Sequence, residues 1–166
     1  NNPIPTKHGL KVLVFGNSFT QDTLAYLPNI LRQANITDCI VAGGCGAGMA
    51  FDDWMNDINA STHRSNYTYN VSTNGGDIVQ YGSYSIDMLL DKEDWDIIVL
   101  QERSYKADYI CFFYPYMEQF MSYIKNRIKN RKLCFLYNMV WGTSSTYDNA
   151  SKQQYNDIIS TTKRMN

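Results

Sequence analysis

The stretch KVLVFGNSFT, residues 11–20, decides the fold of this chain. Its first half is a short run of apolar and β-branched residues without polar alternation, which is typical of a strand buried on both faces of a sheet. Gly16 then allows a tight turn, and apolar residues recur at helical spacing from Leu24 onward. The stretch therefore predicts a strand that turns directly into a helix, with Asp22 as its candidate cap and Pro28 in its first turn or at a kink.

Strand and helix signals alternate along the rest of the chain. We expect strands at 36–42, 96–100 and 133–140, and helices at 51–58, 86–90, 117–128 and 148–163. This alternation implies right-handed crossovers and a mainly parallel sheet covered on both faces, the doubly wound α/β class. The length of 166 residues, without a repeat or a linker, predicts one domain over residues 1–166.

Residues 60–84 differ in composition, being rich in Asn, Ser, Thr and Tyr. Alternation at 67–71 and at 78–81, around the turn signal of residues 74–76, predicts a β-hairpin insertion. Its tyrosines fit cross-strand pairs, which is the favoured interpretation, or a surface that stacks on sugars.

The composition excludes several functions. Fifteen Lys and Arg against sixteen Asp and Glu leave a formal charge of -1, so no basic field attracts nucleic acid or an anionic membrane. The longest apolar run is about five residues, far below the roughly 20 that span a bilayer. The four cysteines lack the paired spacings of zinc or redox sites, so we expect buried free thiols and no metal.

Polar residues gather where the predicted parallel strands end. In open α/β sheets, ligands bind at this edge, which here carries residues 16–20, 43–48, 101–104 and 141–145. The hydroxyl of Ser18 can act as a nucleophile there, and its backbone N–H can help to stabilise an oxyanion. Gly46 or Gly44 is the candidate second backbone donor, and the candidate side-chain amides are those of Gln101 and Asn17.

These residues also have structural interpretations. A serine after a strand is most often a helix cap or a turn residue. Gln101 and Glu102 can simply end a strand, and Arg103 can pair with Glu102 or with nothing. The glycines of residues 43–48 do not form the Gly-x-Gly-x-x-Gly pattern, and no Gly-Lys-Ser/Thr ending follows them, so nucleotide binding is not expected.

The turn at residues 16–20, Gly-Asn-Ser-Phe-Thr, resembles block one of the SGNH (GDSL-like) hydrolases, in the bacterial branch with Gly-Asn-Ser-Phe in place of Gly-Asp-Ser-Leu. Further matches follow in order, at residues 43–46, 95–101 and 114–116, so that the likeness spans about residues 11 to 145. The resemblance implies a three-layer α/β/α, flavodoxin-like fold. It also implies ester hydrolysis by a serine nucleophile, with an oxyanion hole and a histidine base.

Carried over residue by residue, the resemblance implies Ser18 as the nucleophile and first oxyanion donor. It implies Gly46 as the second donor, with Gly44 as the rival alignment. The asparagine of the family's third block is missing, and Gln101 is the expected substitute amide, with Ser104 close by.

The general base is a larger departure from the family. SGNH hydrolases carry Asp-x-x-His after a fifth strand, and residues 141–166 contain no such sequence. We therefore expect the sheet to stop before its last strand, the base to follow Asn166 in a longer protein, and this portion to be weakly active or inactive. His63, in the polar insertion, and His8, before the first strand, are expected to be bystanders.

The expected substrate is a small acyl ester, such as an acetyl group on a carbohydrate, and no cofactor is expected. Trp54, Trp141 and several tyrosines suit sugar stacking at an open edge, and Asn17 and Ser104 are further candidate contacts. The alternative is a non-catalytic carbohydrate-binding module on the same scaffold. The lack of an initial Met, together with a glycan substrate, favours an exported protein.

Overall fold

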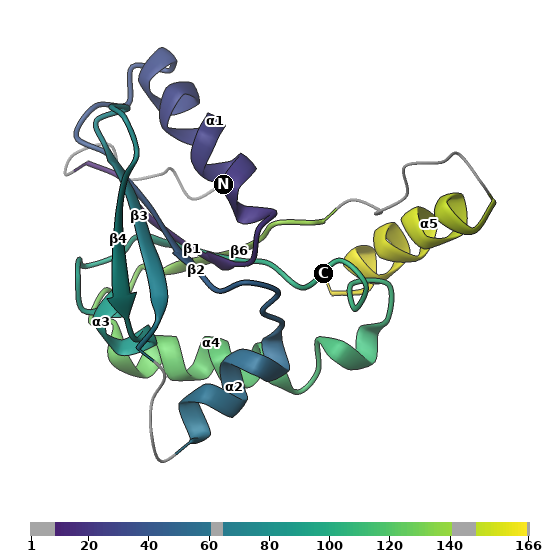
Figure 1. Cartoon of the computed structure of the whole chain (residues 1–166). Coiled ribbons are helices and arrows are strands. Elements are labelled where there is room, and N and C mark those ends of the chain that lie inside the picture. The colour runs from purple at the N-terminus through teal and green to yellow at the C-terminus, as the bar shows by residue number, and fades with distance from the viewer. Residues whose placement is uncertain (1–8, 61–64, 141–148, 166) are drawn as a thin grey trace.

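The structure is a computed structural model that describes residues 9–60, 65–140 and 149–165 (Figure 1). It has a mixed α/β fold built around a six-stranded, mostly parallel sheet in the order β4-β3-β2-β1-β5-β6. The strands are β1 (Lys11–Gly16), β2 (Ile40–Cys45), β3 (Tyr67–Thr73), β4 (Val79–Tyr84), β5 (Ile97–Leu100) and β6 (Cys134–Tyr137). The helices are α1 (Thr20–Gln33), α2 (Phe51–Asn59), α3 (Ile86–Leu90), α4 (Tyr116–Arg127) and α5 (Asn149–Arg164), with a 3-10 turn, η1, at Ile110–Phe112.

The strand order shows where loops of neighbouring strands separate. β2, β1, β5 and β6 run parallel, and the chain moves from β1 to β2 on one side but returns to the other side of β1 for β5. The loops after β1 and β5 therefore lead to opposite sides of the sheet, and in open α/β sheets ligands bind at the carboxyl ends of two such strands. The predicted parallel sheet is confirmed.

The predicted hairpin is confirmed and extends the sheet. β3 pairs antiparallel with β2, and β4 pairs antiparallel with β3. Tyr67 lies opposite Tyr84, and Tyr69 lies opposite Tyr81, so the tyrosines form cross-strand pairs as favoured from the sequence.

Helices pack on both faces of the sheet, an arrangement compatible with three layers. On one face, α1 buries Leu24 and Leu31 against the valines of β1 and β2. On the other face, α2 and α4 meet over Phe15, whose ring centroid lies 5.5 Å from that of Trp54 and 5.2 Å from that of Phe120. Burial of these large side chains is the main source of stability for the layer.

The predicted second strand is wrong in its bounds. The expectation was a strand at 36–42 and a glycine loop at 43–48, but β2 begins at Ile40 and includes Gly43 and Gly44. These glycines serve packing, because a Cβ on Gly43 would lie 2.6 Å from Leu24 and one on Gly44 would lie 2.6 Å from Leu89. Leu24 and Leu89 therefore pack closely against β2 at two positions that have no side chain.

Two smaller expectations are also corrected. α1 begins at Thr20, so Asp22 lies inside its first turn rather than at its cap, and Pro28 is buried within the helix. Asp22 still favours the helix there, because acidic groups stabilise its positive end. Cys111 and Cys134 are exposed, so the cysteines are not uniformly buried, although all four are free thiols.

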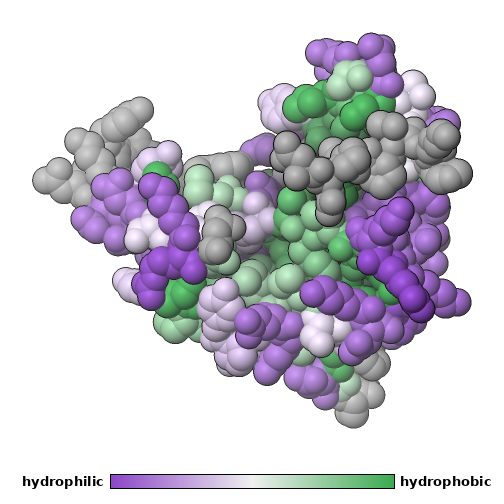
Figure 2. Space-filling view, turned by 180° about the vertical axis from the view of Figure 1, so that it is seen from behind, coloured by the Kyte–Doolittle hydropathy of each residue, from purple (hydrophilic) through white to green (hydrophobic). Residues whose placement is uncertain are grey.

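One edge of the sheet carries exposed apolar groups. Along β6, Phe135 and Tyr137 pack toward the core, whereas Leu136 is 50% exposed, and Met139 beyond the strand is 37% exposed. Figure 2 shows apolar side chains gathered beside α1 on the face turned away in Figure 1.

Among the described residues, no helix combines the length and the apolar character that a membrane span requires.

Candidate functional site at the carboxyl edge of the sheet

The loops that follow β1 and β2 are hydrogen-bonded to each other. The backbone N–H of Gly46 donates to the carbonyl of Gly16 at 3.1 Å. Asn17 is buried, and its Nδ2 donates to the carbonyl of Met49 at 3.1 Å. The two loops therefore form one unit at the carboxyl ends of their strands.

Ser18 is exposed at the tip of the first loop. The N–H of Thr20 donates to the carbonyl of Asn17 at 3.0 Å, and the N–H of Gln21 donates to the carbonyl of Ser18 at 3.2 Å, which makes a tight turn into α1. Asn17 Oδ1 also accepts from the N–H of Phe19 at 3.2 Å. Asn17 thus fixes the turn from inside, while Ser18 lies at the positive end of a 14-residue helix, which favours negative charge on a nearby oxygen.

Gln101 lies fully buried at the end of β5, beneath this turn. Its Oε1 accepts from the hydroxyl of Thr20 at 3.0 Å, whereas its Nε2 has no hydrogen-bond partner among the described residues. Gly16 makes the arrangement possible, because a Cβ there would lie 2.0 Å from Thr20 Oγ1 and 2.9 Å from Gln101 Oε1. A buried unpaired donor is costly, so Nε2 is a position that an acceptor on a bound molecule would stabilise.

The glycine residues expected to supply a second donor occupy other roles. Gly46 lies beside the Ser18 loop, as expected, but its N–H is used by Gly16. Gly44 lies inside β2, opposite Phe15 of β1. Gly48 has a φ of +65°, a conformation that favours glycine, and a Cβ there would lie 2.8 Å from Nη2 of Arg103.

Glu102 is a buried acid whose role the sequence did not reveal. It is fully buried, and it accepts from its neighbouring N–H at Arg103 (2.6 Å) and from the N–H of Phe51 at the start of α2 (3.4 Å). Burial raises its pKa to about 8, against the lowering effects of these hydrogen bonds and of the charge on Lys106. Glu102 is therefore mostly protonated at neutral pH, and it joins the loop after β5 to α2.

Tyr137 of β6 faces this acid. Its hydroxyl is buried without a partner of ordinary hydrogen-bond geometry among the described residues. Burial and the proximity of Glu102 raise the pKa of Tyr137. At neutral pH Tyr137 is therefore uncharged, and Glu102 is mostly uncharged.

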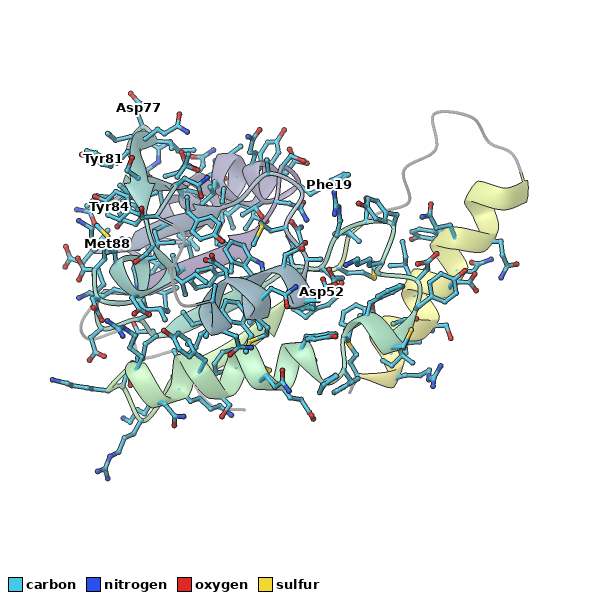
Figure 3. The ribbon with its side chains drawn as sticks, turned by 60° about the horizontal axis from the view of Figure 1, so that its bottom comes forward. Phe19, Asp52, Asp77, Tyr81, Tyr84 and Met88 are labelled. Carbon is cyan, nitrogen blue, oxygen red and sulfur yellow. The ribbon has the colours of Figure 1, made fainter. Side chains whose placement is uncertain are left out.

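The loop after β5 adds charged and aromatic groups to the edge. Lys106 forms an ion pair with Asp52 of α2, with Nζ 2.6 Å from Oδ2. The guanidinium of Arg103 lies over the exposed ring of Tyr105, 4.4 Å from its centroid. Figure 3 places Phe19 and Asp52 toward the same end of the molecule, away from Tyr81 and Tyr84 of the hairpin and from Met88 of α3.

Other predicted site residues are not part of this cluster. Trp54 was expected on the open edge, which is wrong: it is fully buried and stacks on Phe120 with 5.9 Å between centroids. Ser104 is buried in the loop after β5. Trp141, His8 and His63 lie outside the described residues. No group of His, Cys, Asp and Glu in the described part of the chain could hold a metal ion.

These features define a mixed α/β protein with a polar site at the carboxyl edge of its parallel strands. Residues 11–166 match the family described as a domain of unknown function, DUF4886, and the chain belongs to that family. A crystal structure of a DUF4886 family protein from Bacteroides uniformis ATCC 8492 has the same fold, with a TM-score of 0.81 at 21% sequence identity. The match covers 94% of this chain and 62% of the crystallised chain. No curated protein matches.

Proposed function

We propose that this protein is a serine-dependent ester hydrolase of the SGNH type, with Ser18 as its nucleophile. The observation that carries the proposal is the exposed position of Ser18 directly after β1, where the strand order reverses between β1 and β5. A hydroxyl on a tight turn between a strand and a helix is accessible to a carbonyl carbon, and the helix end favours the negative charge that attack creates.

In the proposed reaction, Ser18 Oγ attacks the ester carbonyl and its proton passes to a general base. The carbonyl oxygen becomes an oxyanion, and collapse of this intermediate expels the alcohol and leaves an acyl-serine that water hydrolyses. The base is a histidine, as the resemblance implies. The described residues include no histidine, so the base is the part of the proposal that depends on the rest of the protein.

Two donors serve the oxyanion in this proposal. One is the backbone N–H of Ser18, and the other is Nε2 of Gln101, which has no partner among the described residues. Gly46 would join them only if its hydrogen bond to Gly16 opened. Asn17 acts as a positioning residue, since its side chain holds the two loops together.

The proposed substrate is a small acyl ester, such as an acetyl group, on a carbohydrate. The loop after β5 presents two large aromatic rings, Tyr105 and Tyr109, which are 55% and 58% exposed. Such rings stack on the apolar faces of sugars. In this proposal they have the sugar-stacking role that was expected of Trp54. A shallow edge of this kind suits a small acyl group on a large alcohol.

The test compares hydrolysis of p-nitrophenyl acetate and of acetylated xylo-oligosaccharides by the wild-type protein and by Ser18→Ala. Imidazole is added in a parallel series as an external base, and Ser122→Ala, an exposed serine on α4, is the matched control. We expect Ser18→Ala to lower the rate at least about a hundredfold and Ser122→Ala to leave it unchanged.

Equal rates for wild type and Ser18→Ala would remove Ser18 as the nucleophile. If neither protein hydrolyses either substrate but both bind the oligosaccharide equally, the protein is the non-catalytic carbohydrate-binding module instead. Circular dichroism of both variants verifies that folding is preserved.

A further inference from the structure

Arg103 and Tyr105 form a unit that the proposed hydrolysis leaves unused. The guanidinium carbon lies 4.4 Å from the ring centroid of Tyr105. The same guanidinium lies against Gly48, where a Cβ would come within 2.8 Å of Nη2. Ring stacking and this close contact restrict the guanidinium to one place on the edge, which lowers the entropy cost of binding a ligand.

The charge of Arg103 is not neutralised within the described residues. The two acids in the first turn of α2 are engaged elsewhere: Asp52 pairs with Lys106, and Asp53 accepts the backbone N–H of Ala50. The adjacent acid, Glu102, is buried against main-chain N–H groups, and its pKa of about 8 leaves it mostly uncharged at neutral pH. Arg103 therefore presents an uncompensated positive charge in the described part of this edge.

A short chain of contacts links this charge to the nucleophile position. Arg103 touches Gly48, and the carbonyl of the next residue, Met49, accepts from Nδ2 of Asn17. Asn17 directly precedes Ser18. A molecule bound at Ser18 and extending along the second loop would reach the guanidinium.

We propose that Arg103, held by Tyr105, is an anion subsite that binds a carboxylate of the substrate, so that the ester is carried by an acidic sugar. A guanidinium presents paired N–H donors that match a carboxylate in a bidentate geometry. A single uncompensated cation fits a singly charged group, because the second nearby cation, Lys106, is already neutralised by Asp52. The inference rests on the proposed function only in assigning this carboxylate to the ester substrate.

The test is a binding titration that needs no turnover. Glucuronate, glucose 6-sulfate, glucose 6-phosphate and glucose are titrated into protein with nitrogen-15-labelled arginine, and the side-chain Nε–Hε signal of Arg103 is followed by NMR. The variants are Arg103→Met and Arg131→Met, the second being a change at an exposed arginine before β6 that removes the same charge. Thermal unfolding verifies that each variant is folded.

We expect glucuronate to shift the Arg103 signal saturably and glucose not to shift it. Arg103→Met should weaken glucuronate binding by about tenfold or more, and Arg131→Met should leave it unchanged. Unchanged affinity in Arg103→Met, or equal losses in both arginine variants, would overturn the subsite. Tighter Arg103-dependent binding of the sulfate or phosphate sugar would overturn the assignment to a carboxylate. Binding is measured apart from hydrolysis. A failure of Ser18 as the nucleophile would therefore appear in the hydrolysis assay, whereas a failure of the Arg103 subsite would appear in the titration.

Discussion

Replacement of Glu102 by glutamine tests the electrostatics of the site in a way that does not depend on catalysis. Burial raises the pKa of this carboxyl from 4.5 to about 8, so the folded state holds the proton more tightly than the unfolded state. Stability is therefore greatest below the unfolded pKa, falls as the pH rises from 4.5 to about 8, and levels off above it. A glutamine side chain has the same shape as glutamate and is neutral at every pH, so the Glu102→Gln variant should lack this dependence.

The size of the effect follows from the difference between the two pKa values. Each unit corresponds to about 1.4 kcal/mol, so the ionised Glu102 carboxylate destabilises the folded state by on the order of 5 kcal/mol at high pH. Between about pH 6 and pH 9, the wild type should lose about 3 kcal/mol more of its free energy of unfolding than Glu102→Gln. The residue is fully buried, so solvent does not screen the effect.

The assay is urea unfolding at several pH values, followed by the fluorescence of the buried residues Trp54 and Trp95. Glu118→Gln, which removes an exposed carboxylate from α4, is the control and should follow the wild-type curve. Parallel pH profiles for wild type and Glu102→Gln would refute the reasoning, since they would mean that burial does not hold the proton on Glu102.

Two further variants test the geometry beneath Ser18. Gly16→Ala should lower the free energy of unfolding by about 3 kcal/mol, because the new Cβ would lie 2.0 Å from Thr20 Oγ1; Gly82→Ala, with nothing within 4 Å, should cost nothing. Equal effects of these two changes on chemical denaturation would contradict the close packing. Thr20→Val should cost about 1 to 3 kcal/mol, since Gln101 Oε1 would lose its buried partner, and it should also slow hydrolysis. Full stability of Thr20→Val in the same assay would mean that this hydrogen bond contributes nothing.

The local pattern of apolar and polar residues predicted those strands and helices whose position depends only on which side chains are buried. The unalternating runs at β1 and β5 and the alternation at β3 identified strands, because both patterns report which faces are covered. The bounds of β2 were missed, since Gly43 and Gly44 are strand residues only in the presence of Leu24 and Leu89, which reach them from distant parts of the chain.

The candidate site was predicted in part for the same reason. The position of Ser18 after the first strand follows from sequence spacing, whereas the pairing of Thr20 with Gln101 joins residues 81 positions apart and depends on strand order. Trp54 was misplaced, although the helical spacing of the apolar residues Phe51, Trp54 and Met55 indicates its inward position. One indication in the sequence that Glu102 is buried is its position just after the buried strand β5. That position does not specify which groups surround the carboxyl.

The most direct test of the central proposal is to identify which residue a serine-reactive fluorophosphonate labels. The protein is incubated with the probe, digested, and mapped by mass spectrometry. We expect the label on Ser18, with no labelling in Ser18→Ala and normal labelling in Ser122→Ala. Absence of label from Ser18, or attachment to another serine with Ser18 unmodified, would contradict the account.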